Sequence, residues 1–225
     1  MNGDLRLIIF DVDGTLVDSQ GDIIAAMTRA FDRAGAPVPP RRAILSIVGL
    51  SLPEAFARLA PQIDAALRVQ MVEWYKDAYV DLRSESGAAQ SSPFYPHVRE
   101  ILDDLARVPE NLLAVATGKS RRGLDKLLEG HGLTGFFINE QVSDLHPSKP
   151  HPSMLRAALS ETGVDAGNAV MIGDTSYDME MAAAAGIKGI GVSWGYHPRE
   201  SLGAAQVIVD DFRALPETIL TVLEA

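Results

Sequence analysis

The sequence predicts an α/β fold: a three-layer core built on a parallel sheet, with an all-helical domain inserted into it. Short segments rich in Ile and Val alternate with helical patterns, which is typical of strand–helix–strand units. One block, residues 19–84, breaks this alternation because all of its periodicity is helical. The chain has 225 residues, 47% of them hydrophobic, which is enough for one large core with a smaller insertion.

The expected strands are apolar runs bounded by turn residues. Runs of this kind are typical of a parallel sheet that is covered on both faces. We expect strands at 5–10, 112–116, 169–172 and 187–192, and weaker ones at 136–139 and 206–209. Helical patterns occupy the intervening segments 97–107, 120–131, 152–162, 176–185 and 212–224.

The inserted block contains several helix signals. Apolar side chains between residues 23 and 34 fall on one helical face, and Gly35-Ala36-Pro37 ends that helix. Pro40 is expected as the first residue of a second helix. The sequence from Ser51 to Glu54 matches a capping box, which would start a third helix.

A long amphipathic stretch at 64–83 follows, and then the small, polar segment 84–93, which has the composition of a linker. These limits predict a core of residues 1–17 and 93–225 and an inserted domain of residues 18–92.

Composition excludes several classes of partner and site. The net charge of −10 and the pI of about 4.9 argue against a nucleic-acid or anionic-membrane partner, since both need clustered Lys and Arg. The absence of cysteine excludes disulfides and thiolate metal sites, and fits a reducing cytoplasm. The first apolar run is too short for a signal peptide, and none approaches the roughly 18 residues of a membrane span. We therefore expect a cytoplasmic monomer or homodimer.

Polar clusters follow four predicted strands, and the carboxyl ends of parallel strands form the usual ligand site of such sheets. The first cluster holds Asp11 and Asp13, with Gly14 letting the chain curl. Two adjacent carboxylates repel each other unless a cation neutralises them or one is protonated. The pair suits a divalent metal together with a nucleophile and an acid/base, although an ordinary strand-to-turn connection also explains it.

The second and third clusters suit an anion. Thr117, Gly118 and the amides up to Ser120 resemble an anion cradle before a helix, although a plain N-cap at Ser120 is the simpler explanation. Lys149, followed by a proline, can present a point charge to phosphate, or can be an ordinary surface lysine.

The fourth cluster pairs Asp174, at the end of a strand, with Asp178 in the first turn of the next helix. This arrangement suits a metal ligand and a supporting carboxylate, and carboxylates and phosphate oxygens are ligands that Mg²⁺ favours. Helix capping by Asp174 or Thr175 would also account for it.

Together, in this order, the clusters resemble the haloacid dehalogenase-like hydrolase superfamily. The motif residues are Asp11-x-Asp13-Gly14-Thr15, Thr117, Lys149-Pro150 and Gly173-Asp174-x₃-Asp178. The inserted block resembles the small α-helical cap of that superfamily. The resemblance spans nearly the whole chain and implies a Rossmann-like core with an inserted cap domain.

The resemblance also implies roles. Asp11 would be the nucleophile that forms an aspartyl phosphate, and Asp13 the general acid and base. Mg²⁺ would be held by Asp11, by the backbone carbonyl of Asp13 and by Asp174, with Asp178 acting through water or by orienting Lys149. The groups expected to bind the transferring phosphoryl group are Thr117, Gly118, Lys119 and Lys149.

Asp13 favours phosphoryl transfer, since dehalogenating relatives usually have Tyr there. The segments 94–98 and 115–124 and the size of the cap look most like phosphoglycolate phosphatase-type members, although many relatives have Gly at His97 and Asn at Gly118. We expect a Mg²⁺-dependent phosphomonoester hydrolase acting on 2-phosphoglycolate or another small phosphorylated metabolite.

Other activities stay open at this point. The alternatives are an inorganic pyrophosphatase, a sugar-phosphate mutase, a dehalogenase and a non-catalytic binding subunit. Val48 and Leu52 replace the Lys and Arg of many mutases. Arg41 and Arg42 would either meet a second substrate anion or be solvated. The segment 194–197 would either line the rim of the site or serve only to pack against neighbouring side chains.

Overall fold

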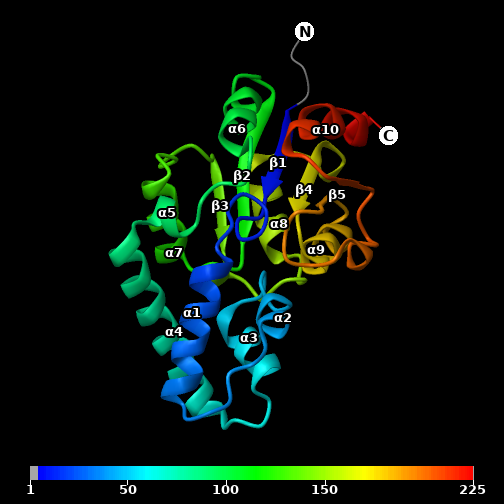
Figure 1. Cartoon of the computed structure of the whole chain (residues 1–225). Helices are drawn as coiled ribbons and strands as arrows, with labels where there is room; N and C mark the ends of the chain where they lie inside the picture. The colour runs from blue at the N-terminus through cyan, green and yellow to red at the C-terminus, as the bar shows by residue number, and fades with distance from the viewer. Residues whose placement is uncertain (1–4, 225) are drawn as a thin grey trace.

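The structure, a computed structural model, describes residues 5–224, without the side chains of residues 83–86 and 88. A six-stranded, all-parallel sheet forms its centre, in the order β3-β2-β1-β4-β5-β6 (Figure 1). The strands are β1 (Arg6–Phe10), β2 (Asn111–Thr117), β3 (Asn139–Val142), β4 (Ala169–Gly173), β5 (Lys188–Val192) and β6 (Val207–Val209). The predicted α/β fold is confirmed.

Alternation of side chains along the strands produces the three layers. Ile8 and Phe10 pack with α6, α7 and α10 on one face, whereas Leu7 and Ile9 pack with α8 and α9 on the other. These helices are α6 (Val98–Ala106), α7 (Arg121–Gly130), α8 (Ser153–Thr162), α9 (Ser176–Ala185) and α10 (Leu215–Glu224). Short 3₁₀ turns lie at Ser143–Leu145, Ala166–Asn168, Arg199–Ser201 and Phe212–Ala214. None of the described helices has the length and apolarity that crossing a membrane requires.

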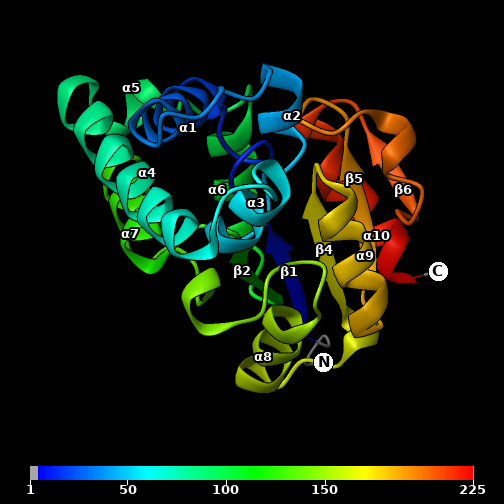
Figure 2. The ribbon, with the colours of Figure 1, turned by 90° about the horizontal axis from the view of Figure 1, so that it is seen from below.

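A helical insertion, α1–α5, lies between β1 and β2. It consists of α1 (Gln20–Arg33), α2 (Arg41–Leu45), α3 (Leu52–Leu59), α4 (Ala65–Ser86) and α5 (Ala88–Ser91). It has its own hydrophobic cluster, in which Phe56 stacks on Phe31 and meets the edge of Tyr75. In Figures 1 and 2, α1, α3 and α4 lie together beyond the carboxyl end of β1.

The chain runs into and out of the insertion side by side. Val17 and Phe94 form an antiparallel bridge, and the amide of Asp18 donates to the carbonyl of Pro93 at 2.9 Å. This crossing lies next to the limits predicted for the inserted domain, residues 18 and 92. That division into two domains stays a prediction, and its outer ends, residues 1–4 and 225, lie outside the described residues.

The predicted strand at 136–139 is wrong by three residues, since β3 is Asn139–Val142. The apolar run before β3 belongs to the core without being part of the strand, because Phe137 packs there ahead of the strand. The strand buries polar side chains: Gln141 donates to Asn139 at 2.9 Å and to Glu161 of α8 at 3.0 Å. An edge strand with a polar partner on a covering helix needs no apolar pattern.

Three details of the insertion also differ from expectation. Helix α3 begins at Leu52, but Ser51 makes no side-chain cap, so the predicted capping box is wrong. The amide of Ser51 instead donates to Ser148 Oγ of the core at 2.9 Å. Pro40 lies one residue before α2 rather than in it. The expected linker 84–93 contains the end of α4 and the whole of α5.

Gly118 is the point where the loop after β2 meets the insertion. A Cβ at Gly118 would lie 2.6 Å from the carbonyl oxygen of Gly49 and 2.8 Å from that of Leu50. Cβ atoms do not approach backbone oxygens that closely, so only a hydrogen atom fits. The departure from the Asn of many relatives therefore has a structural reason in this chain.

Gly118→Ala should push the loop at residues 47–50 away from the core. We expect a loss of about 1–3 kcal/mol in the free energy of unfolding, the usual cost of overpacking, and faster amide exchange in this loop. Gly203→Ala is the matched control, because Gly203 lies outside the helices and strands and its added Cβ meets nothing within 4 Å. Exchange and stability that match the control would show that the contact is not tight.

His97, at the start of α6, is the one described non-glycine residue with a positive φ, 66°. This conformation costs a non-glycine residue about 1–2 kcal/mol. A glycine avoids that strain, but it also makes the unfolded chain more flexible, which offsets part of the gain in the free energy of unfolding. His97→Gly should therefore raise the free energy of unfolding by about 0.5–1 kcal/mol, measured by urea titration. His97→Ala keeps the strain and should give no gain; an equal gain in both variants would mean that the ring, rather than the backbone, is unfavourable.

Candidate active site

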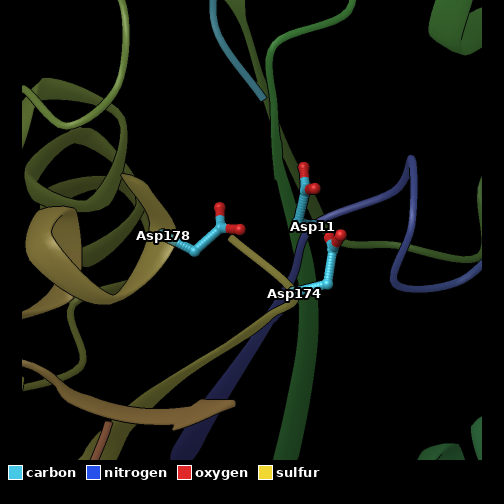
Figure 3. Close-up of side chains that lie close together, drawn as sticks. All are labelled: Asp11, Asp174 and Asp178. Atoms are coloured by element: carbon cyan, nitrogen blue, oxygen red, sulfur yellow. The ribbon is translucent and has the colours of Figure 1, made fainter. Parts of the chain in front are cut away.

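The sheet brings three carboxylates together at its carboxyl edge. Asp11 directly follows β1 and Asp174 directly follows β4, two strands that pair in parallel. Asp178 lies in the first turn of α9 and faces back toward them. Figure 3 shows the three carboxyl groups converging, and one oxygen from each lies within 4.8 Å of the others.

Three glycines provide the room for these carboxylates. A Cβ on Gly14 would lie 2.3 Å from Asp174 Oδ2, and one on Gly195 would lie 2.1 Å from the Cβ of Asp174. A Cβ on Gly173 would lie 2.4 Å from Asp178 Cγ. Gly14 also has a φ of 88°, which favours glycine, so it permits both the turn and the close approach.

Lys149 lies buried among these acids. Its Nζ donates to Asp11 Oδ1 at 2.8 Å and to Asp178 Oδ1 at 2.7 Å. The other oxygen of Asp178 accepts hydrogen bonds from the amide of Thr175 at 3.1 Å and from its hydroxyl at 2.7 Å. The amide of Asp178 in turn donates to Thr175 Oγ1 at 3.3 Å, and the two amide bonds form a capping box at the start of α9. Asp178 is therefore fixed by its own helix and in turn fixes Lys149.

Three buried carboxylates around one ammonium group leave excess negative charge. Burial raises the pKa of Asp11 to about 7, since the nearby Lys149 charge offsets desolvation only in part. Burial, with the charges of Asp11 and Asp178, also raises the pKa of Asp174 well above its usual range. Burial alone lowers the pKa of Lys149, but the two carboxylates outweigh it and raise that pKa.

The same site has a free ligand position. Asp11 Oδ2 is buried and accepts no hydrogen bond from any described residue. The oxygens of Asp174 accept hydrogen bonds from Thr15 Oγ1 at 3.0 Å and from the amide of Tyr196 at 2.7 Å, which fix this carboxylate next to Asp11. Excess charge, an unpartnered oxygen and an all-oxygen donor set fit a hard divalent cation.

Asp13 is held apart from that group, between the core and the insertion. Its Oδ1 accepts a hydrogen bond from Ser19 Oγ and lies 2.9 Å from Lys119 Nζ. Lys119 Nζ also donates to the hydroxyl of Tyr79, in α4, at 3.1 Å. Ser19 is tied to the core as well, because its amide donates to Tyr196 Oη at 2.8 Å.

Thr117 ends β2 and is buried, and its Oγ1 accepts from the amide of Lys119 at 3.2 Å. The next helix begins with the expected cap, where Ser120 Oγ accepts from the amide of Gly123 at 3.2 Å. One cavity is lined by Asp11, Asp13, Thr117, Gly118 and Lys119.

The structure thus brings together all eight residues expected in the site. Those outside the cavity lining, Lys149, Asp174 and Asp178, lie against Asp11. Arg41 is not part of the site: it donates to Gln20, and neither it nor Arg42 is among the described residues that line the cavity.

Sequence reasoning left the segment 194–197 undecided between rim and packing, and the structure places it against the acids. The amide of Tyr196 donates a hydrogen bond to Asp174, and Trp194 Nε1 donates one to the carbonyl of Thr15 at 3.1 Å. Ser19 and Tyr79, which contact Asp13 and Lys119, were missed altogether. A backbone amide or a contact across the insertion leaves no pattern in one sequence.

Comparison with known proteins agrees with this geometry. The family model described as haloacid dehalogenase-like hydrolase matches residues 8–192. A probable phosphatase, IndB, of Dickeya dadantii is 39% identical, covering 92% of this chain and 90% of its own. A phosphoglycolate phosphatase of Caulobacter vibrioides is 33% identical, covering 96% and 91%.

Among solved structures, a haloacid dehalogenase-like hydrolase family protein of Streptococcus pneumoniae superposes with a TM-score of 0.78 at 25% identity, covering 96% of this chain and 97% of that one. The match of the family model extends from β1 to β5 and includes every carboxylate of the site. This chain therefore belongs to the haloacid dehalogenase-like hydrolase family.

Proposed function

We propose that this chain is a Mg²⁺-dependent phosphomonoester hydrolase that works through an aspartyl phosphate on Asp11. The main support is the state of the Asp11 carboxylate: Lys149 holds one oxygen at 2.8 Å, and the other, beside Asp174, has no partner among the described residues. Asp11 lines the same cavity as Asp13, so a nucleophile and an acid face one space. The relatives named as phosphatases support the same reaction class.

In the first step, an oxygen of Asp11 attacks phosphorus and the ester P–O bond breaks, while Asp13 gives a proton to the departing alkoxide. In the second step, Asp13 takes a proton from water, whose oxygen attacks the phosphorus of the aspartyl phosphate. Inorganic phosphate leaves and the Asp11 carboxylate is restored. Thr117 and Lys149 stabilise the charge on the transferring phosphoryl oxygens.

Asp11 and Asp174, with the backbone carbonyl of Asp13, would hold Mg²⁺, and Asp178 would act mainly by holding Lys149. When bound, the ion would lower the repulsion between the carboxylates and an anionic substrate. Ser19 and Lys119 keep Asp13 in place, at the boundary between the loop after β1 and the insertion.

The relatives make 2-phosphoglycolate the first candidate substrate, with other small phosphorylated metabolites as alternatives. The helical insertion would act as the cap that excludes water from the site. The expectation of a small phosphorylated partner follows from the same relatives.

Purified protein should hydrolyse p-nitrophenyl phosphate with Mg²⁺ and stop when EDTA is added. Asp11→Asn should remove turnover, because an amide is too weak a nucleophile to attack phosphorus. Asp13→Ala should lower kcat by roughly 10²- to 10⁴-fold, the usual contribution of a general acid and base. Release of p-nitrophenol measures all three.

Asp103→Asn, which changes a partly exposed acid on α6 that pairs with Arg99, is the matched control and should keep full activity. The reaction class would be wrong if the unmodified chain gave no turnover with Mg²⁺. The role of Asp11 would be wrong if Asp11→Asn retained turnover while Asp103→Asn did the same.

Mg²⁺ should also stabilise the folded chain, independently of any turnover. At about one hundred times its dissociation constant the ion adds about 2.7 kcal/mol, which corresponds to a rise in Tm of roughly 5–11 °C. Asp174→Asn should abolish this rise, measured by thermal unfolding. An unchanged shift in Asp174→Asn would place the ion elsewhere.

Without Mg²⁺, stability should fall as pH rises from about 5 to about 8. The folded-state pKa of Asp11, about 7, lies above its ordinary value of 3.8, so between these values the folded chain holds a proton that the unfolded chain has lost. Urea unfolding at both pH values measures the fall. It should be smaller in Asp11→Asn, and an equal fall in both proteins would contradict the assignment.

A further inference from the structure

The cavity at the candidate active site is larger than the phosphoryl group needs. It has a volume of about 590 Å³ and extends from Asp11 and Asp13 to Lys126 and Glu129 of α7. Those two side chains are 66% exposed, so the far end reaches the surface. Figures 1 and 2 show α4 of the insertion beside α7 of the core, and both helices contribute residues to the cavity lining.

The insertion is in contact with the core in the structure that contains this cavity. Tyr79 of α4 accepts a hydrogen bond from Lys119 at 3.1 Å, and Ser51, just before α3, donates to Ser148 at 2.9 Å. On a third side, the carbonyl of Ser46 lies 3.1 Å from the ring Nε2 of His197. The insertion therefore contacts the core at these three places in this structure.

The wall opposite the catalytic acids is apolar. The described lining residues between positions 23 and 55 carry no charge and no polar side-chain atom: Ile23, Met27, Ile47, Val48, Gly49, Leu50, Leu52 and Ala55. Further along, Tyr75 and Tyr79 stack with ring centroids 5.8 Å apart. The aliphatic residues between positions 23 and 55 stabilise an apolar group and offer no side-chain partner to a carboxylate or a sugar hydroxyl, and the rings of Tyr75 and Tyr79 add apolar area beside them.

Four of the described lining residues are cations, Lys76, Lys119, Arg122 and Lys126, and none of them lies between positions 23 and 55. Lys119 contacts Asp13 at 2.9 Å, Lys76 contacts Glu73 at 2.7 Å and Lys126 contacts Glu129 at 2.6 Å. Pockets of about 300–1,000 Å³ take ligands of drug size. The two-carbon acid of 2-phosphoglycolate would fill only part of 590 Å³ and would face apolar side chains.

We propose that the preferred substrate is a phosphate monoester whose alcohol carries a bulky, mainly apolar group, of the size of a ring, that packs against Leu50, Leu52 and Tyr75. This substrate class rests on the proposed phosphatase function. It makes the insertion a selector of apolar alcohols. It also departs from the candidate that the relatives suggest, because it places 2-phosphoglycolate, pyrophosphate and sugar phosphates among the poorer substrates.

The test compares three esters of primary alcohols, so that leaving-group chemistry stays similar: 2-phenylethyl phosphate, ethyl phosphate and 2-phosphoglycolate. With Mg²⁺, kcat/KM for 2-phenylethyl phosphate should exceed that for each of the others by at least about tenfold. A smaller preference, or a preference for 2-phosphoglycolate, would overturn the inference while leaving the phosphatase function intact. If none of the esters nor p-nitrophenyl phosphate turned over, the proposed function itself would fail.

Leu52→Arg tests the wall directly. A cation there should lower kcat/KM for 2-phenylethyl phosphate by about tenfold or more and raise it for 2-phosphoglycolate. Leu220→Arg, at a 42%-exposed leucine of α10, is the matched control and should leave both values unchanged. If a folded Leu52→Arg, verified by thermal unfolding, gave the control's values, the wall would not contact substrate. If it did not fold, the ranking of the three esters on the unmodified chain would still decide.

Discussion

The candidate active site depends on one buried ammonium group. Lys149 Nζ lies 2.8 Å from Asp11 and 2.7 Å from Asp178, and it is the cation that allows these carboxylates to be buried next to Asp174. One positive charge does not balance three negative ones, and burial raises the pKa of Asp11 and of Asp174. The site is therefore built with a deficit of positive charge, which a divalent cation would correct.

The rest of the fold supports this arrangement. Parallel pairing of β1 with β4 places Asp11 beside Asp174, and glycines at 14, 173 and 195 leave the space that the carboxyl groups occupy. The loop that supplies Lys149 also holds the insertion, because Ser148 accepts from the amide of Ser51. Charge balance in the site and one contact between the insertion and the core thus depend on the same short segment.

Much of this could be predicted from sequence, because the signals were local. Apolar runs and helical periodicity predicted the sheet and the insertion, and the four polar clusters led to the family that the comparison confirms. The errors came where tertiary contacts replace local ones. β3 is polar because Glu161 of α8 satisfies its side chains, and Ser51 bonds across to the core instead of capping its helix.

The sequence by itself determined the fold class, the family and the set of candidate site residues, since motif order and spacing are properties of the chain. Only the tertiary structure decided the partners of those side chains. The amide of Tyr196, the hydroxyl of Ser19 and the close approach of Gly118 to the insertion join residues far apart in the chain. The tertiary structure also decided the size of the cavity and its apolar wall, because both arise from the packing of α1, α3 and α4 over the sheet edge.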